Sequence, residues 1–217
     1  MMTNLFSVFD PCTGFFSLNW MSTFLFIIIL PYNFWLMPNK ILLNFNMLII
    51  MVSKEMNSLM KYKGNNLIMI SLFLFILINN LWGLLPYVFT SSSHISFSLS
   101  LALPMWLSFM LFGWINKTNK MFSHLVPIGT PTILMPFMVL IETISNFIRP
   151  GSLAVRLSAN MIAGHLLMSL LGSTSNNLML ISILMIILMM LMMFELAVSI
   201  IQSYVFLTLT TLYSSEI

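Results

Sequence analysis

Long runs of apolar residues dominate the chain and are separated by short polar segments. The clearest is 67–89, which is uncharged and long enough to cross the hydrocarbon core of a bilayer. A similar run, 95–115, follows the short polar turn 90–94, and an earlier run covers 17–36. The pattern predicts a transmembrane helix in each of these three runs.

Residues 41–60 have a different pattern. Their apolar positions alternate with charged and amide side chains, among them Lys54, Glu55, Asn44 and Asn57. A mixed face of this kind is typical of a helix that lies on the membrane surface. We therefore expect an interfacial amphipathic helix here.

The last two apolar segments, 131–172 and 178–213, are too long for upright spans. The second contains neither Gly nor Pro and would form a helix about 54 Å long, against a bilayer core of about 30 Å. We expect Pro136 and Pro150 to kink the first segment, and residues 172–177 to form a turn. The sequence thus predicts an all-α polytopic membrane protein, a single domain over 1–217 that ends in a strongly tilted helical hairpin.

Composition agrees with this class, because 59% of the residues are hydrophobic and only 6% are charged. A soluble domain carries about 25% charged residues. The six lysines fall within Lys40–Lys63 and Lys117–Lys120, both of which flank apolar runs. This arrangement indicates a positive-inside bias rather than a nucleic-acid site, so both lysine clusters share one side and the N-terminus faces the other.

No Lys or Arg precedes Lys40, so we expect neither a cleaved signal nor a transit peptide. The abundance of methionine, with 22 residues, favours an AT-rich gene read with a mitochondrial code. Cys12 is the single cysteine, which excludes a disulfide within the chain.

Ionisable residues inside the predicted hairpin are the main candidates for function. An arginine at the centre of a bilayer costs from about 3 to above 10 kcal/mol, and such groups usually have functional roles. The alternative is structural: two arginines and two glutamates in this region pair and hold the hairpin together. The residues concerned are Glu142, Arg149, Arg156, His165, Glu195 and Gln202.

Arg156 lies among small residues. At about 100° per residue it shares a helix face with Ser152, Ala159, Asn160 and Ala163. Small side chains let a neighbouring helix approach closely, so we expect Arg156 to meet a partner group rather than lipid. Because a guanidinium stays charged, it acts as an electrostatic barrier and not as a proton relay.

Two further residues are candidate proton sites. His165 lies nine residues beyond Arg156, about 13.5 Å along the helix and half a turn round, and titrates near neutral pH. An interhelical hydrogen bond is an equally open role for it. Glu195 belongs to a polar stripe with Ser199, Gln202 and Tyr213. We favour Glu195 as a proton site over Glu195 as a buried strut, and Glu142 is read in the same way.

The other polar residues indicate no further chemistry. His94 and His124 are expected to be solvated in loops, and no two histidines have metal-ligand spacing. Asn79 and Asn80 are expected to make helix-to-helix hydrogen bonds. No nucleotide loop or hydrolytic triad is present, so we expect no metal, no cofactor and no catalysis on a soluble substrate.

Two segments carry specific motifs: Leu153–Leu167 (LAVRLSANMIAGHLL) and Glu195–Phe206 (ELAVSIIQSYVF). Both closely resemble subunit a of the mitochondrial F-type ATP synthase. Supporting similarity lies in Asn80–Pro86, Gly129–Pro131 and Ile141–Ser145, so the resemblance covers most of the chain from Leu67 onward.

The resemblance implies that Arg156 matches the family's essential arginine, which separates two offset half-channels and displaces protons from a rotor ring. His165, Glu195 and Glu216 would belong to the channel open to the intermembrane space. Glu142 would belong to the matrix-side channel, while Asn160 and Gln202 would flank the arginine. Arg149 matches no position of the motif.

The implied partners are the ring of carboxylate-bearing hairpin subunits, the peripheral stalk, other membrane-sector subunits, protons and the lipid bilayer. The implied location is the mitochondrial inner membrane, with the lysine-rich loops in the matrix and the N-terminus in the intermembrane space. Such a subunit is not itself an enzyme. Two alternatives are a membrane subunit of another ion-translocating respiratory complex, which would need repeated or broken helices, and a purely structural anchor.

Overall fold

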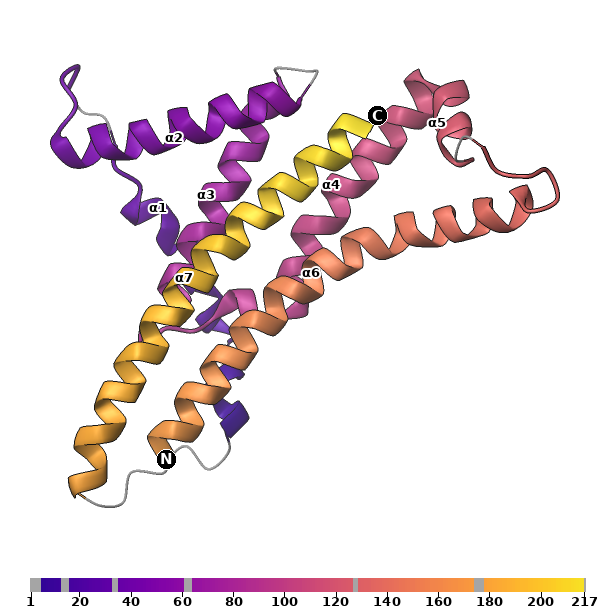
Figure 1. The fold of residues 1–217 in the computed structure, drawn as a ribbon. Helices are drawn as coiled ribbons and strands as arrows, with labels where there is room; N and C mark the ends of the chain where they lie inside the picture. The colour runs from indigo at the N-terminus through magenta and orange to yellow at the C-terminus, as the bar shows by residue number, and fades with distance from the viewer. Residues whose placement is uncertain are drawn as a thin grey trace.

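All regular structure in the described part of the chain is helical (Figure 1), which confirms the predicted class. This computed structural model describes residues 5–12, 16–32, 35–60, 64–126, 129–173 and 178–216. Of these helices, α3, α4, α6 and α7 are long and apolar enough to cross a membrane. In chain order the elements are η1 (Leu5–Phe9), η2 (Leu18–Phe24), α1 (Leu25–Ile29), α2 (Lys40–Leu59), α3 (Asn65–Gly83), η3 (Ser91–Ser93), α4 (Ile95–Asn116), α5 (Thr118–His124), α6 (Met135–Ser173) and α7 (Leu178–Glu216).

The N-terminal apolar run is helical over a shorter stretch than expected. A helix over 17–36 was predicted, whereas η2 and α1 together cover Leu18–Ile29. Their combined length is about 21 Å, less than the bilayer core of about 30 Å. The helix ends there because Leu30 precedes Pro31 and takes extended backbone angles, φ −58° and ψ 124°.

Helix α2 runs across the upper end of α3 rather than alongside it (Figure 1), as expected for an interfacial helix. Its first residue donates its backbone N–H to the side chain of Asn39. A second contact joins α2 to α7, where the Tyr204 hydroxyl donates to Oε2 of Glu55 at 3.0 Å. This hydrogen bond ties the interfacial helix to the hairpin.

Helices α6 and α7 form the predicted hairpin and run obliquely side by side (Figure 1). Each has 39 residues and is therefore about 58 Å long. Helix α6 bends part of the way along its length, and Pro150 inside it explains the bend by removing one backbone hydrogen bond. Pro136 does not kink α6, because it lies in the first turn, where its missing N–H has no partner to lose. Most of the predicted turn 172–177 lies outside the described residues.

Two connecting segments differ from the prediction. The lysine-bearing loop around Lys117–Lys120 contains a short helix, α5, whose Phe122 ring packs edge to face on the Trp114 ring of α4, with centroids 4.7 Å apart. Helix α3 ends at Gly83, earlier than predicted, because the chain turns there towards Pro86 and Tyr87, whose φ is 68°. The turn that follows contains η3.

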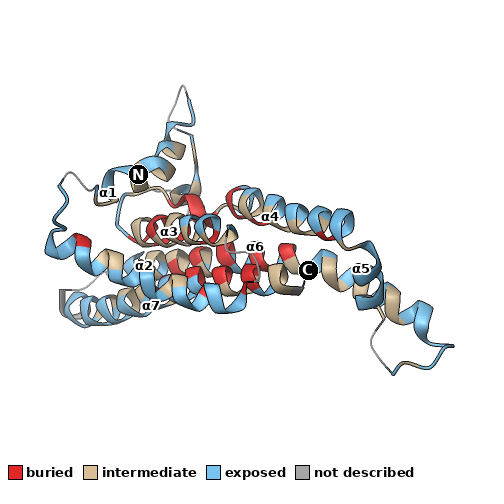
Figure 2. Cartoon of the chain, turned by 90° about the horizontal axis from the view of Figure 1, so that it is seen from above, coloured by how far each residue is buried: buried red, intermediate tan, exposed pale blue. Residues whose placement is uncertain are grey.

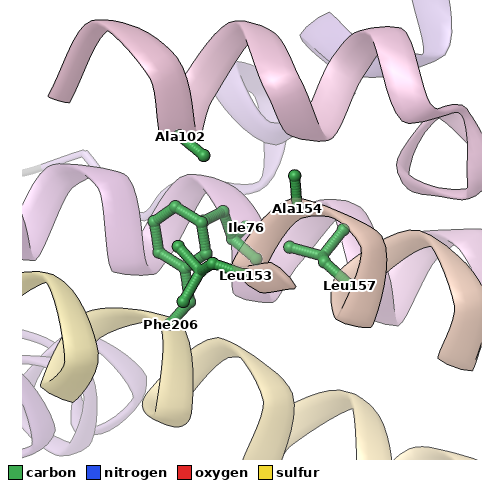
Figure 3. Close-up of a cluster of buried hydrophobic side chains, with 6 residues drawn as sticks. All are labelled: Ile76, Ala102, Leu153, Ala154, Leu157 and Phe206. Carbon is green, nitrogen blue, oxygen red and sulfur yellow. The ribbon is translucent and has the colours of Figure 1, made fainter. Parts of the chain in front are cut away.

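The buried residues gather where α3, α4, α6 and α7 meet (Figure 2). Leu153, Ala154 and Leu157 of α6 contact side chains from the three other helices (Figure 3). Those partners are Ile76 of α3, Ala102 of α4 and Phe206 of α7. This cluster fixes one face of α6 against the bundle, so its opposite face is left open.

Candidate functional site

Arg156 lies on the open face of α6. Its side chain is exposed, and so are Ser152, Ala159 and Ala163, three of the four small residues predicted to share its face. Asn160 of the same face is half-buried. Within the described residues Arg156 makes no ion pair. The structural alternative, in which both arginines pair with glutamates inside the chain, therefore does not apply to Arg156.

Asn160 links this face to α7. Its Nδ2 donates to Oε1 of Gln202 at 2.9 Å, one helical turn from Arg156. Gln202 is buried and Asn160 is half-buried, so the bond lies at the edge of the helix contact. The two amides predicted to flank the arginine are thus brought together.

We expect the effects of Asn160→Ala and Gln202→Ala on the free energy of unfolding to be coupled through this hydrogen bond. Each single change loses the same bond, so the double variant should lose less stability than the sum of the two. Interhelical hydrogen bonds in membranes contribute about 0.6 kcal/mol on average by this measure. Thermal unfolding of the purified protein in detergent measures it, and strict additivity would contradict the bond.

The side chain of Glu195 in α7 lies against α6 at Gly164. A Cβ built on Gly164 would overlap both carboxylate oxygens of Glu195. The side chain of Glu195 is only 7% exposed. The glycine therefore lets a carboxylate from α7 lie directly on the backbone of α6, next to the position of His165.

His165 lies one residue beyond this contact and points towards the N-terminal segment. Its ring lies against the backbone of Gly83 in α3 and meets the ring of Phe9 edge to face, with centroids 6.2 Å apart. Its Nε2 is buried without a hydrogen-bond partner in the described residues. The described residues include no hydrogen bond between His165 and Glu195, although they are neighbours through Gly164.

A cavity of about 590 Å³ opens beside His165. It lies between the N-terminal segment, the turn after α3 and the adjoining ends of α6 and α7. Its polar lining includes Ser7, Asp10, Asn19 and Ser169. His165 is therefore connected to a space that leads to the surface of the chain.

Glu142 and Arg149 lie together nearer the other end of α6. Oε1 of Glu142 is 3.6 Å from Nη2 of Arg149, two helical turns away, and each side chain is 28% exposed. The guanidinium also lies over the ring of Tyr213 in α7, 5.4 Å from its centroid. Arg149 is thus a pairing residue, as one interpretation of the sequence had it.

The polar stripe of α7 faces α6 and the bundle. Glu195, Ser199 and Gln202 are buried, while Tyr213 is half-buried against Arg149. Further hydroxyls on this helix are buried that the polar pattern did not single out, those of Ser203, Thr210 and Thr211. Each donates to a carbonyl of its own helix, and the Thr210 hydroxyl also lies within hydrogen-bond distance of the Met69 sulfur in α3, at 3.6 Å.

Three predictions about polar residues outside the hairpin are wrong. His94 is not solvated: its ring packs against the rings of Trp20 and Phe89, with centroids 5.2 Å away in each case, and its Nε2 is buried. Asn79 donates to the carbonyl of Phe75 in its own helix rather than to another helix. Asn80 is fully buried, and its amide has no partner among the described residues. The side chains in and around the α3–α4 turn are buried together with Asn79 and Asn80, which keeps water away from them.

Two other predicted residues lie at the ends of helices. His124 ends α5 and is exposed, as expected. Glu216 is the last residue of α7, but its side chain lies outside the described part of the structure. Over the described ranges, no three His, Cys, Asp or Glu side chains are placed to hold a metal ion.

Comparison with known proteins gives matches over almost the whole chain. A family model described as ATP synthase A chain matches residues 15–215. The chain is 58% identical over 223 residues to ATP synthase subunit a of Drosophila melanogaster. It is 57% identical over 225 residues to that of Aedes aegypti and 56% identical over 225 residues to that of Anopheles gambiae. Each alignment covers 100% of both chains, so it includes every residue of the site described above.

Proposed function

Because the chain belongs to the ATP synthase A chain family, we propose that it is the proton-conducting stator subunit in the membrane sector of an F-type ATP synthase. The location that follows is the inner mitochondrial membrane. The full-length matches give no support to the alternative of a subunit of another respiratory complex. ATP itself is made on other subunits, and this chain supplies the path for protons.

The observation that carries the proposal is the open face around Arg156. A permanent charge on an uncovered helix face at membrane depth is costly unless a partner meets it. The small side chains around it permit an apposed helix to come very close. A ring of hairpins, each with a carboxyl group at mid-membrane, is a partner of the right charge and shape.

Two paths lead towards this face from opposite ends of the hairpin. At one end the cavity reaches His165, and Glu195 follows across Gly164. At the other end Glu142 lies beside Arg149. We place the entry path at His165 and Glu195 and the exit path at Glu142, with Arg156 between them as the barrier. Glu216 is assigned to the entry path by the family resemblance alone.

Sidedness follows from the lysines. Helices α2 and α5, which carry the described residues Lys40, Lys54 and Lys120, lie towards the same end of the molecule (Figure 1). By the positive-inside rule this end faces the matrix. The cavity and the N-terminal segment then face the intermembrane space.

The mechanism moves protons by way of the ring. A proton enters through the cavity, passes His165 and Glu195 and neutralises a ring carboxylate, which can then rotate into lipid. After nearly a full turn it is released towards Glu142, because the carboxylate next to Arg156 must be ionised. Each charge that crosses 100 mV supplies about 2.3 kcal/mol for rotation.

Cysteine cross-linking in the assembled membrane sector tests the apposition to the ring. With Cys12→Ser as background, Ala159→Cys should form a disulfide with a cysteine placed beside the ring carboxylate. Ala159 is exposed on the face of Arg156, whereas Ala154 is fully buried, so Ala154→Cys is the matched control. Cross-linking of the control but not of Ala159→Cys would place the ring elsewhere.

A further inference from the structure

The N-terminal segment packs on the functional site rather than apart from it. Element η1 lies beside the C-terminal end of α6 (Figure 1). There the Phe9 ring meets the His165 ring edge to face. A stretch of chain more than 150 residues away in sequence thus forms part of the surroundings of a proposed proton site.

The same segment provides one wall of the cavity that reaches His165. Ser7, Val8 and Asp10 line this wall, and Asn19 lies beside them. The volume of about 590 Å³ holds several water molecules, each of which needs about 30 Å³. The polar residues of the lining give water in the cavity hydrogen-bond partners within otherwise largely apolar surroundings.

Asp10 is the acidic group at the rim of this cavity and is exposed to solvent. Its carboxylate oxygen accepts the backbone N–H of Cys12 at 3.1 Å, and its backbone carbonyl accepts from Nδ2 of Asn19 at 3.3 Å. The sequence contains no Lys or Arg before Lys40, so no Lys or Arg side chain of this segment offsets the charge. These hydrogen bonds hold the carboxyl group of Asp10 at the edge of the cavity.

We propose that Asp10 is the proton-collecting group at the mouth of the entry path, and that η1 forms part of the wall of that path. This inference rests on the proposed function. A negative charge at the rim of a narrow cleft raises the local concentration of cations, here hydronium, and speeds their capture. Protons then pass through the water of the cavity to His165.

Asp10→Asn is the direct test, because the amide oxygen still accepts the N–H of Cys12 and only the charge is lost. Proton-driven ATP synthesis is measured in the reconstituted complex, with alkaline pH and weak buffer on the cavity side so that proton capture limits the rate. At about 10 mM ionic strength we expect Asp10→Asn to make ATP at a two- to fivefold lower rate. This is about the change in capture rate that a single charge at the mouth of the cavity produces. At about 0.5 M salt the difference should vanish, because screening is then effective within a few ångström.

Two matched variants separate charge from structure. Asp10→Glu should behave like the unmodified protein. Asp10→Ala loses both charge and acceptor, so a defect in Asp10→Ala with a normal Asp10→Asn would mean a structural role and overturn the proposal. A defect in Asp10→Asn that persists unchanged at high salt would overturn it as well.

Cys12 reports the charge independently of proton transport. A hydrogen bond between the Cys12 thiol and the side chain of Asp10, together with the negative charge of Asp10, raises the pKa of the thiol above its ordinary value. Because the thiolate is the reactive form, Asp10→Asn should lower that pKa and speed alkylation of Cys12 near neutral pH. Faster alkylation with an unchanged transport rate at low salt would refute the collecting role alone. If the unmodified complex made no ATP from a proton gradient, the proposed function would fail instead.

Discussion

Arg156→Ala should abolish coupled ATP synthesis in the assembled complex. In the proposed mechanism the positive charge of Arg156 is the barrier between the two half-channels, and alanine supplies no charge. Protons would then pass from Glu195 and His165 to Glu142 without turning the ring. We expect proton-driven synthesis to fall by at least about 100-fold, which corresponds to a loss of about 2.7 kcal/mol or more of coupling.

The matched control for this variant is Arg149→Gln. It removes the same type of charge from the same helix, seven residues away, where the guanidinium is paired with Glu142. This change should alter the rate of proton release but open no leak across the membrane. Normal synthesis in Arg156→Ala, or an equal leak in both variants, would show that Arg156 is not the barrier.

Gly164→Ala should block the entry path while leaving the fold intact. The new methyl group would occupy the place of the Glu195 carboxylate, which lies at the end of a flexible side chain and can move away. Displacement of a proton-transfer group by about 1 Å costs on the order of 100-fold in rate. Proton uptake through the reconstituted complex should therefore fall between about 10- and 100-fold, with normal assembly of the subunit.

Gly151→Ala provides the comparison within the same helix. Nothing lies within 4 Å of a Cβ at Gly151, so alanine fits there without displacing any group. Because alanine favours a helix over glycine by about 1 kcal/mol, this variant should assemble at least as well and transport protons normally. Equal defects in both variants would mean that helix flexibility, and not the position of Glu195, limits the rate.

The long helices could be predicted from sequence because their signal is local. Long apolar runs define α3, α4 and α7, and the run 178–213, which has neither Pro nor Gly, is too long for an upright span. The errors lie where the position of a single proline determines whether a helix ends or bends. Pro31 ends the first helical stretch early, while Pro136 does no harm in a first turn. Both depend on the exact place of proline relative to a helix end, which periodicity does not give.

The candidate site was predictable to the extent that charge in an apolar run is a signal by itself. Arg156, Glu195 and Glu142 stood out for that reason, and the helical repeat placed the small residues correctly on the face of Arg156. The sequence alone did not decide whether Arg149 pairs with Glu142, because a separation of seven residues on one helix permits the contact without requiring it.

Contacts between distant segments were not predictable from sequence. Gly164 meets Glu195, Phe9 meets His165, and Tyr204 meets Glu55 only because the helices cross at those points. None of these pairs has a local pattern. The same holds for His94. Its place in a short polar turn suggested that it is solvated, whereas two aromatic rings pack against it.

Proton conduction with the ring held still shows whether Arg156 separates the two half-channels. The disulfide from Ala159→Cys to the ring would lock rotation, and passive proton flux would be measured across vesicles that contain the locked membrane sector. With Arg156 present, the locked sector should conduct no protons above background, because the two half-channels connect only through the turning ring. With Arg156→Ala added, the locked sector should leak. Conduction by the locked sector that retains Arg156, or the absence of a leak after its removal, would contradict the account.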